Sequence, residues 1–372
     1  MFPQFPRAER WLSLGGAIVH GHIQTCVRND GSYFEQSTYY HMYALDMFAF
    51  HASLEPVPPP YLEKLKRTAE FLAAIVSEGG ELPFLGDDDG GRFFHPYGAR
   101  QRFARASLAV ASLLVGERFF AYNRRDSAEI AAWWLGPERC QHVPAASFED
   151  QSRVFNDSGI VVMRHGPVVA VVDAGPFGPG SAGHSHSDTL ALVVTVGDQE
   201  VLIDSGAYSY MDPEWRAYFR GSAAHNTIRI DGKDQGVAAG PFRWMQKPEV
   251  KLLDSTTDTG PNRVVGTCSY QGFTHTRKVE FANSEFSVTD EIAGPAGEHD
   301  VEQFWHFAVE PRELSAGKWA IGDLAEFTPD GGVVEPAWRS RCLGTKKPAW
   351  VIVVRRRAAL PFELHAHLRL KP

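Results

Sequence analysis

Three things are scarce in this sequence of 372 residues, and each scarcity excludes a class of protein. No apolar run approaches the ~18–20 residues of a membrane-spanning helix, so membrane insertion is not expected. Lys and Arg number 37 against 45 Asp and Glu, a formal net charge of −8, which argues against a nucleic-acid partner. The few cysteines form no CxxC pair, which excludes a zinc ribbon and a dense disulfide framework: Cys26, Cys140, Cys268 and Cys342.

The start of the chain does not read as a secretion signal. The stretch "MFPQFPRAERWLSLGGAIVHGH" carries acidic and polar residues inside its apolar region and has no small-residue cleavage site. A chain that begins as written is expected to be cytoplasmic, and one whose true N-terminus lies upstream is expected to be periplasmic or secreted.

The first part of the chain has the apolar spacing of helices. Apolar residues recur at three- and four-residue steps, and proline or glycine punctuates the segments. In 58–78, for example, Leu62, Leu65, Ala69, Leu72 and Ile75 share one stripe after a proline run. The spacing predicts helices at 9–28, 37–52, 58–78, 102–117 and 126–137.

After about residue 150 the pattern becomes that of short strands. Two β-branched runs flank a His-Gly-Pro turn at 158–175, and a hairpin turns at Gly197-Asp198 within 189–206. Many short strands with frequent turn signals predict an antiparallel sandwich. We therefore predict an α+β protein with a helical domain at 1–145 and a β-sandwich at 146–372. Further strands are predicted at 226–232, 248–255, 263–270, 275–282, 285–292, 301–309, 350–357 and 362–370.

The hairpin at 189–206 is bordered by possible metal ligands. His184, His186 and Asp188 precede it within "GHSHSD", and Asp204 follows it. In a regular hairpin Asp204 lies opposite Ala191, so a shared metal requires residues 184–189 to curl back over the strand end. The period of two puts both histidines on one face, which leaves open which of them binds metal.

Five stretches give the chain a resemblance to a known family, the heparinase II/III-like polysaccharide lyases. The stretches occur in order across the helix-to-strand change, and the resemblance extends over nearly the whole chain. The resemblance implies an incomplete α/α toroid followed by an antiparallel β-sandwich. The stretches are "DGSYFEQSTYYH" (30–41), "LPFLGDDDGG" (82–91), "GHSHSDTL" (183–190), "LIDSGAYSY" (202–210) and "WRAYFRGSAAHNTIRIDGKDQ" (215–235).

The resemblance implies cleavage of a uronic-acid-containing polysaccharide by β-elimination, which leaves a 4,5-unsaturated uronate. Such an enzyme neutralises the uronate carboxylate, removes the weakly acidic C5 proton and protonates the C4 oxygen. Tyr40 matches the family's proton-transfer tyrosine, with Tyr39 as a neighbouring alternative. His184 matches the residue that binds the carboxylate or transfers a proton. The residues expected to bind substrate are His41, Tyr208, Arg216, Tyr218 and Arg220.

The resemblance also implies a structural Zn²⁺ beside the active site and no organic cofactor. His186, Asp204 and His225 match the family's zinc ligands, and two imidazoles with one carboxylate suit tetrahedral zinc. Asp188 is either a partner that holds a histidine tautomer or a loop cap. The "GDDDGG" segment lacks the ligand spacing of an EF-hand and is interpreted as a turn near the cleft.

One departure from the family pattern bears on activity. Members carry an asparagine about fifty-odd residues before the catalytic tyrosine, and no asparagine precedes Asn29 here. The sequence is therefore expected to be either a fragment of a longer open reading frame or a reduced relative.

Two alternatives remain open. The first is a non-catalytic glycan-binding or exopolysaccharide-assembly protein. The second is a non-haem Fe(II) oxygenase in which His186, Asp188 and His225 form a two-histidine, one-carboxylate triad.

Overall fold

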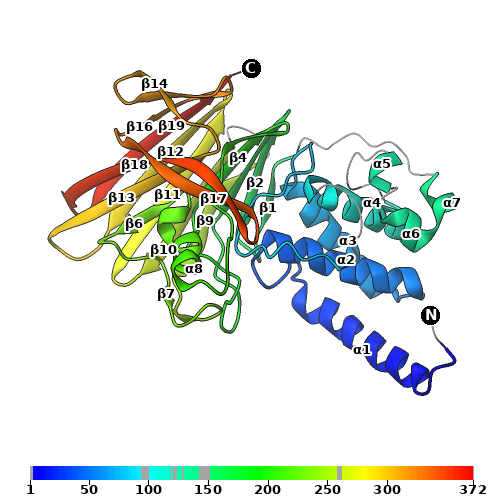
Figure 1. The fold of residues 1–372 in the computed structure, drawn as a ribbon. Helices are drawn as coiled ribbons and strands as arrows, with labels where there is room; N and C mark the ends of the chain where they lie inside the picture. Colours follow the sequence, from blue (N-terminus) through cyan, green and yellow to red (C-terminus); the bar gives the residue numbers. More distant parts are fainter. Residues whose placement is uncertain are drawn as a thin grey trace. The chain divides into compact units, whose positions relative to one another are not determined.

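The computed structural model describes residues 3–93, 100–117, 119, 124–127, 130–141, 151–257 and 262–371. It divides into two compact units. The first comprises Met1–Phe34, His41–Ala73 and Arg92–Glu149; the second comprises Glu35–Tyr40, Ala74–Gly91 and Asp150–Pro372. The predicted domain boundary at 145/146 falls in 142–150, outside the described residues. Helices mixed with antiparallel sheets confirm the predicted α+β class (Figure 1).

The first unit is built from helices that match the predicted segments. The main ones are α1 (Ala8–Cys26), α2 (Thr38–Leu54), α3 (Pro59–Ile75) and α4 (Phe103–Val115). In α3 the predicted stripe faces inward, with Leu65, Ala69 and Leu72 fully buried. The predicted helix at 126–137 corresponds to parts of the short α5 (Arg124–Ser127), α6 (Ala131–Leu135) and α7 (Pro137–Cys140), with residues 128–129 outside the described chain. Among the described residues, no helix is both long and apolar enough to span a membrane.

The second unit contains antiparallel sheets. One has the order β1-β2-β3-β4-β5, and another has the order β14-β15-β16-β19-β12-β11-β10-β9. The order of a third is β17-β18-β13-β6, and β7 pairs with β8. The bounds are β1 (Arg153–Phe155), β2 (Ile160–His165), β3 (Val168–Asp173), β4 (Leu192–Val196), β5 (Gln199–Leu202), β6 (Ile228–Ile230), β7 (Val237–Ala238), β8 (Trp244–Gln246), β9 (Glu249–Thr256), β10 (Asn262–Tyr270), β11 (Phe273–Ala282), β12 (Glu285–Ala293), β13 (Glu298–Phe307), β14 (Arg312–Ser315), β15 (Lys318–Ile321), β16 (Ala325–Pro329), β17 (Val333–Cys342), β18 (Thr345–Ala359) and β19 (Phe362–Leu370).

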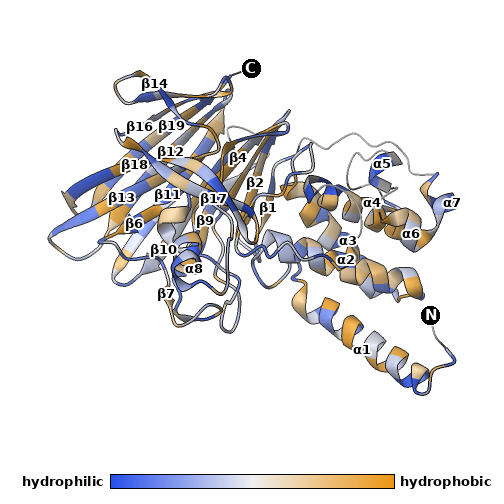
Figure 2. Ribbon diagram, in the orientation of Figure 1, coloured by the Kyte–Doolittle hydropathy of each residue, from blue (hydrophilic) through white to orange (hydrophobic). Residues whose placement is uncertain are grey.

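Burial follows the sequence pattern of each strand. β10 and β11 alternate buried and half-buried residues, as expected for a sheet with one face in the core. All six residues of β3 are buried, which explains its continuous apolar run. Figure 2 shows the same apolar character along β2 and β4. The main core contains six buried large aromatic side chains among the described residues: Phe281, Phe286, Trp305, Phe307, Trp319 and Phe327.

One helix was not among the predicted elements. Residues 213–220 form α8 (Pro213–Arg220), which interrupts the strand-rich part of the chain. The Asp212 carboxylate accepts hydrogen bonds from the backbone N–H groups of Glu214 and Trp215, and Pro213 occupies the first helical position. The Asp-Pro capping signal can be recognised in the sequence. The helix is only 8 residues long, however, which is too short for a helical periodicity of apolar residues to be detected.

Candidate functional site

The Asp87 side chain joins the parts of the candidate site. It is fully buried in the second unit and accepts hydrogen bonds from His184 Nδ1 at 3.2 Å and His186 Nε2 at 2.8 Å. The Arg216 guanidinium binds both carboxylate oxygens, with Nη2 2.9 Å from Oδ2. Burial raises the pKa of Asp87, but hydrogen bonds from the two histidines and the charges of His186 and Arg216 outweigh it and hold the pKa well below its usual range.

Backbone packing around Gly86 places this carboxylate. Gly86 has φ 69°, and a Cβ there would lie 2.7 Å from the carbonyl oxygen of His184 and 2.8 Å from that of Gln36. The Ser37 hydroxyl donates to the carbonyl of Asp87 at 2.6 Å, and the Asp87 N–H donates to the carbonyl of His184 at 2.8 Å. Three distant segments therefore meet here, and only glycine fits where they cross.

Tyr40 lies beside His184. Their ring centroids are 4.3 Å apart, and the Tyr40 hydroxyl is 3.1 Å from the hydroxyl of Tyr210. Burial raises the pKa of Tyr40 well above its usual value; the Tyr210 hydrogen bond opposes this shift, and the negative charge of Asp89 adds to it. The phenol is thus protonated at neutral pH and can donate a proton.

His184 has the surroundings of a supported base. Burial lowers its pKa, but the hydrogen bond to Asp87 and the charges of Asp87 and Glu35 outweigh this and raise the pKa above the usual value. Because Asp87 accepts from Nδ1, the other ring nitrogen, Nε2, is left to act as an acceptor. Glu35 Oε1 is 3.9 Å from Nε2, and the His184 side chain is 27% exposed, so the ring is reachable from solvent.

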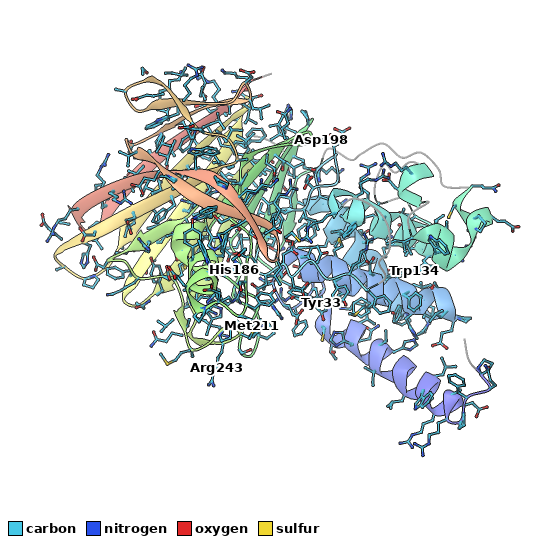
Figure 3. All side chains as sticks on the ribbon, viewed as in Figure 1. Tyr33, Trp134, His186, Asp198, Met211 and Arg243 are labelled. Atoms are coloured by element: carbon cyan, nitrogen blue, oxygen red, sulfur yellow. The ribbon has the colours of Figure 1, made fainter. Side chains whose placement is uncertain are left out.

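His186 and His225 are arranged as a pair of metal ligands. His186, labelled in Figure 3, is fully buried, as is His225, and their ring centroids are 5.3 Å apart. One nitrogen of each ring is held by a carboxylate: His186 by Asp87, and His225 Nδ1 by Asp204 Oδ2 at 2.5 Å. The other nitrogens, His186 Nδ1 and His225 Nε2, are buried and have no hydrogen-bond partner among the described residues. Imidazoles fixed in this way fit a divalent metal.

Two carboxylates are candidates for the third metal ligand. The sequence prediction named Asp204, which in the structure is bonded to His225 and also accepts from the N–H of Gly206 at 2.8 Å. The group whose ligand atoms lie within 4.8 Å of one another consists of His186, Asp188 and His225. The ligand set with Asp204 therefore stays a prediction, and Asp188 is a second candidate.

Residues 187 and 190 do not continue the regular hairpin. The Ser187 N–H donates to the carbonyl of Arg220 at 2.9 Å, and Leu190 has a positive φ of 64°. Asn226 fixes the other side: its amide donates to the carbonyls of Leu192 at 2.8 Å and Ile203 at 2.9 Å. The two ends of the hairpin are thereby tied to the residue that follows His225.

The buried polar residues of the sandwich support these loops. The Arg277 guanidinium binds Asp290, with Nε 2.6 Å from Oδ1, and donates to the carbonyl of Leu190 at 2.8 Å and to that of Asn226. His275 Nε2 also donates to Asp290, at 2.6 Å. His275, Arg277 and His306 are all buried and have internal hydrogen-bond partners.

Arg216, expected to bind substrate, has internal partners. Its side chain is 3% exposed, and besides Asp87 it donates to the carbonyls of Pro241 at 2.9 Å and Gly183 at 3.1 Å. Arg220, one turn further along α8, also donates to Pro241 O, at 3.1 Å, and lies over the Trp244 ring. Burial and the charge of Arg216 lower the pKa of Arg220 to about 10. Both guanidinium groups therefore brace the wall of the site.

The other three residues expected to bind substrate have partners of their own. His41 is buried in the first unit, where it accepts from the N–H of Tyr33 at 3.1 Å while its Nε2 donates to Thr68 O at 2.9 Å. Neither ring nitrogen is left for substrate. Tyr208 packs beneath Lys346, whose Nζ is 4.2 Å from the ring centroid, and the Tyr218 hydroxyl accepts from the N–H of Trp338 at 3.1 Å.

The comparisons with known proteins agree with this arrangement. The model of the family described as heparinase II/III-like, C-terminal, matches residues 149–366, and that of the heparinase II/III N-terminus matches residues 1–89. A heparin-sulfate lyase of Bacteroides stercoris is 24% identical over 310 residues, which are 79% of this chain and 41% of that protein.

Solved structures share the fold over nearly the whole chain. A heparinase III structure aligns with a TM-score of 0.75 at 20% identity, covering 99% of this chain and 56% of that one. The heparan sulfate lyase HepC of Pedobacter heparinus aligns with a TM-score of 0.73 at 18% identity, covering 99% and 57%. The chain thus spans roughly half the length of these relatives. Since the family model covers more than half of the sequence, the chain belongs to the heparinase II/III-like family.

Proposed function

We propose that this chain carries the proton-transfer site of a polysaccharide lyase that cleaves beside a uronic acid by β-elimination. The observation that carries the proposal is the group formed by Tyr40, His184 and Asp87. It combines a protonated phenol with an imidazole supported by a buried carboxylate, on rings 4.3 Å apart. The heparin-sulfate lyases among the relatives support an acidic polysaccharide as the substrate.

The proposed reaction removes one proton from the sugar and delivers another proton to the leaving oxygen. His184 Nε2 accepts the C5 proton, and the electron pair of that C–H bond becomes the C4–C5 double bond. The C4–O bond breaks, and the leaving oxygen takes the proton of the Tyr40 hydroxyl. Asp87 holds His184 in the tautomer that exposes Nε2 and stabilises the imidazolium that forms, as an aspartate does in a catalytic triad.

The proposal is tested by ultraviolet absorbance of the unsaturated uronate. The chain is incubated with heparan sulfate, heparin, alginate and other uronate polysaccharides, beside Tyr40→Phe and His184→Gln. We expect product with at least one substrate and a loss of about 10²–10⁴-fold in each variant. Tyr43→Phe is the matched control, because Tyr43 is a half-buried phenol on α2 outside the contact group. Product formation that survives Tyr40→Phe would refute the assignment.

A second element of the proposal is a zinc ion held by His186, His225 and one carboxylate. Bound zinc would cross-link the two loops that flank the hairpin. Metal content is measured by mass spectrometry in the wild type, Asp188→Asn and Asp204→Asn. The variant that loses its metal identifies the ligand carboxylate. Bound iron with oxoglutarate-dependent turnover would instead favour the oxygenase alternative, whose triad is the set that includes Asp188.

A further inference from the structure

A second cluster of possible metal ligands lies in the first unit, on the facing sides of α1 and α2. His20 of α1 and His51 and Glu55 of α2 each place a ligand atom within 4.8 Å of the other two. His51 and Glu55 are spaced i, i+4, so they share a face of α2. Neither the proposed lyase reaction nor the family motifs of the sequence use these residues.

Each of the two imidazoles has a buried nitrogen that makes no hydrogen bond within the described part of the chain. His20 Nε2 and His51 Nε2 are both buried from solvent and make no hydrogen bond within the described part of the chain. The two rings are 5.0 Å apart between centroids and nearly perpendicular, at 77°. A buried ring nitrogen without a partner is unfavourable, and a shared metal ion would satisfy both nitrogens at once.

The position of the carboxylate agrees with a shared ion better than with a hydrogen bond. His51 Nε2 and Glu55 Oε1 are 3.3 Å apart, yet the geometry does not form a hydrogen bond. Bond lengths of about 2.0–2.2 Å to a tetrahedral zinc place neighbouring ligand atoms roughly 3.3–3.5 Å apart. This pair already has that spacing, and the second histidine needs only a small side-chain adjustment.

The surroundings leave room for the ion and screen it on one side. Gly16 lies one turn before His20, and a Cβ there would be 3.3 Å from Glu55 Oε1 and 3.8 Å from His51 Cε1. The absence of a side chain at Gly16 therefore leaves the ligand atoms uncrowded. The buried Tyr61 ring packs against both imidazoles, at 5.1 and 5.7 Å, while the Glu55 side chain is 33% exposed. An ion can enter from solvent and rest against an apolar wall.

We propose that His20, His51 and Glu55 bind one divalent ion of the zinc, cobalt or nickel type and so cross-link α1 to α2. Imidazole and carboxylate ligands suit these ions, and the remaining position would be taken by water. The site is separate from the ion proposed at His186 and His225, so the chain should bind two equivalents.

The test is a Co²⁺ titration of the metal-free full chain, followed by visible absorbance. We expect the wild type to bind two equivalents and His51→Gln to bind one. Glu55→Gln, which changes a partly exposed side chain, should weaken the second equivalent at least tenfold even if His51→Gln fails to fold. The matched control is His22→Gln on α1, because His22 Nε2 already bonds to the Tyr33 hydroxyl at 2.8 Å.

The outcomes separate this site from the zinc proposed above. If His51→Gln binds one equivalent of Co²⁺ fewer than the wild type and His22→Gln binds as much as the wild type, the site is supported. This holds whether or not an ion binds at His186 and His225. Unchanged binding in both His51→Gln and Glu55→Gln overturns it. A wild type that binds no Co²⁺ also overturns the site at His20, His51 and Glu55. So does a wild type that binds one equivalent which only His225→Gln removes, and that result leaves the zinc proposal intact.

Discussion

The buried pair of Asp87 and Arg216 allows a quantitative test of how the site is held together. Asp87→Asn keeps the shape of the side chain but removes its charge. The Arg216 guanidinium, 3% exposed, would then remain buried beside a neutral amide. Removing one partner of a buried ion pair costs about 3–5 kcal/mol, chiefly because the other charge is left uncompensated. We expect Asp87→Asn to lower the free energy of unfolding of the second unit by that amount.

The reverse substitution should be less damaging. Arg216→Met leaves the Asp87 carboxylate with hydrogen bonds from His184 and His186, so we expect a loss of about 1.5–3 kcal/mol. The double variant has no unpaired buried cation. Its loss should be close to that of Arg216→Met alone, so the coupling energy between the two sites should be about as large as the loss in Asp87→Asn, about 3–5 kcal/mol.

Urea unfolding followed by tryptophan fluorescence measures these losses. Six of the nine tryptophans are in the second unit, so the signal reports mainly on it. Asp323→Asn serves as a control, because Asp323 is an exposed residue of the second unit and its substitution should change stability by less than about 1 kcal/mol. A double variant whose loss equals the sum of the single losses would refute the reasoning.

Three further predictions follow from individual positions. Gly86→Ala should lower the free energy of unfolding by at least about 2 kcal/mol more than Gly197→Ala does. Both glycines have positive φ, but only a Cβ at position 86 would meet two backbone carbonyl oxygens. The difference is measured from the midpoints of urea unfolding. Burial lowers the pKa of His41 in the folded chain to about 4. As the pH falls, the imidazole is therefore protonated in the unfolded chain before it is protonated in the folded chain. The free energy of unfolding should decrease as the pH drops from about 6.5 toward 4. The loss is about 2 kcal/mol at pH 5, and His41→Gln should abolish this component in pH-dependent unfolding. Tyr210→Phe should lower kcat about tenfold with little change in KM in the absorbance assay, since it removes the hydroxyl 3.1 Å from that of Tyr40.

The fold was predictable wherever a single periodicity ran through a segment. The helix at 58–78 and the strands at 263–270 and 275–282 each have one clean pattern of buried residues. β14 and β17 were not predicted, because β14 is exposed throughout and β17 has no regular alternation of buried and exposed residues. Their pairing depends on neighbouring strands rather than on their own sequence.

The family motifs singled out part of the candidate site, and they gave no signal for the part that depends on burial. The motifs led to Tyr40 and His184, which the structure places in contact. Asp87 was missed because three consecutive aspartates look like a solvated turn. Its burial depends on Arg216, 129 residues further along the chain, and on the backbone crossing at Gly86. A charge pair over that distance leaves no local pattern.

Asp87 also connects the two chemical parts of the site. One oxygen accepts from His186, a proposed metal ligand, and the other accepts from His184, the proposed base. Metal binding at His186 Nδ1 would make the Nε2–H group of His186 a stronger hydrogen-bond donor to Asp87. The stronger bond would draw negative charge of the Asp87 carboxylate away from His184. A bound ion should therefore weaken the support that Asp87 gives to the base. The ion is thus expected to change the pH dependence of proton transfer as well as the stability of the loops, and that effect should vanish in Asp87→Asn.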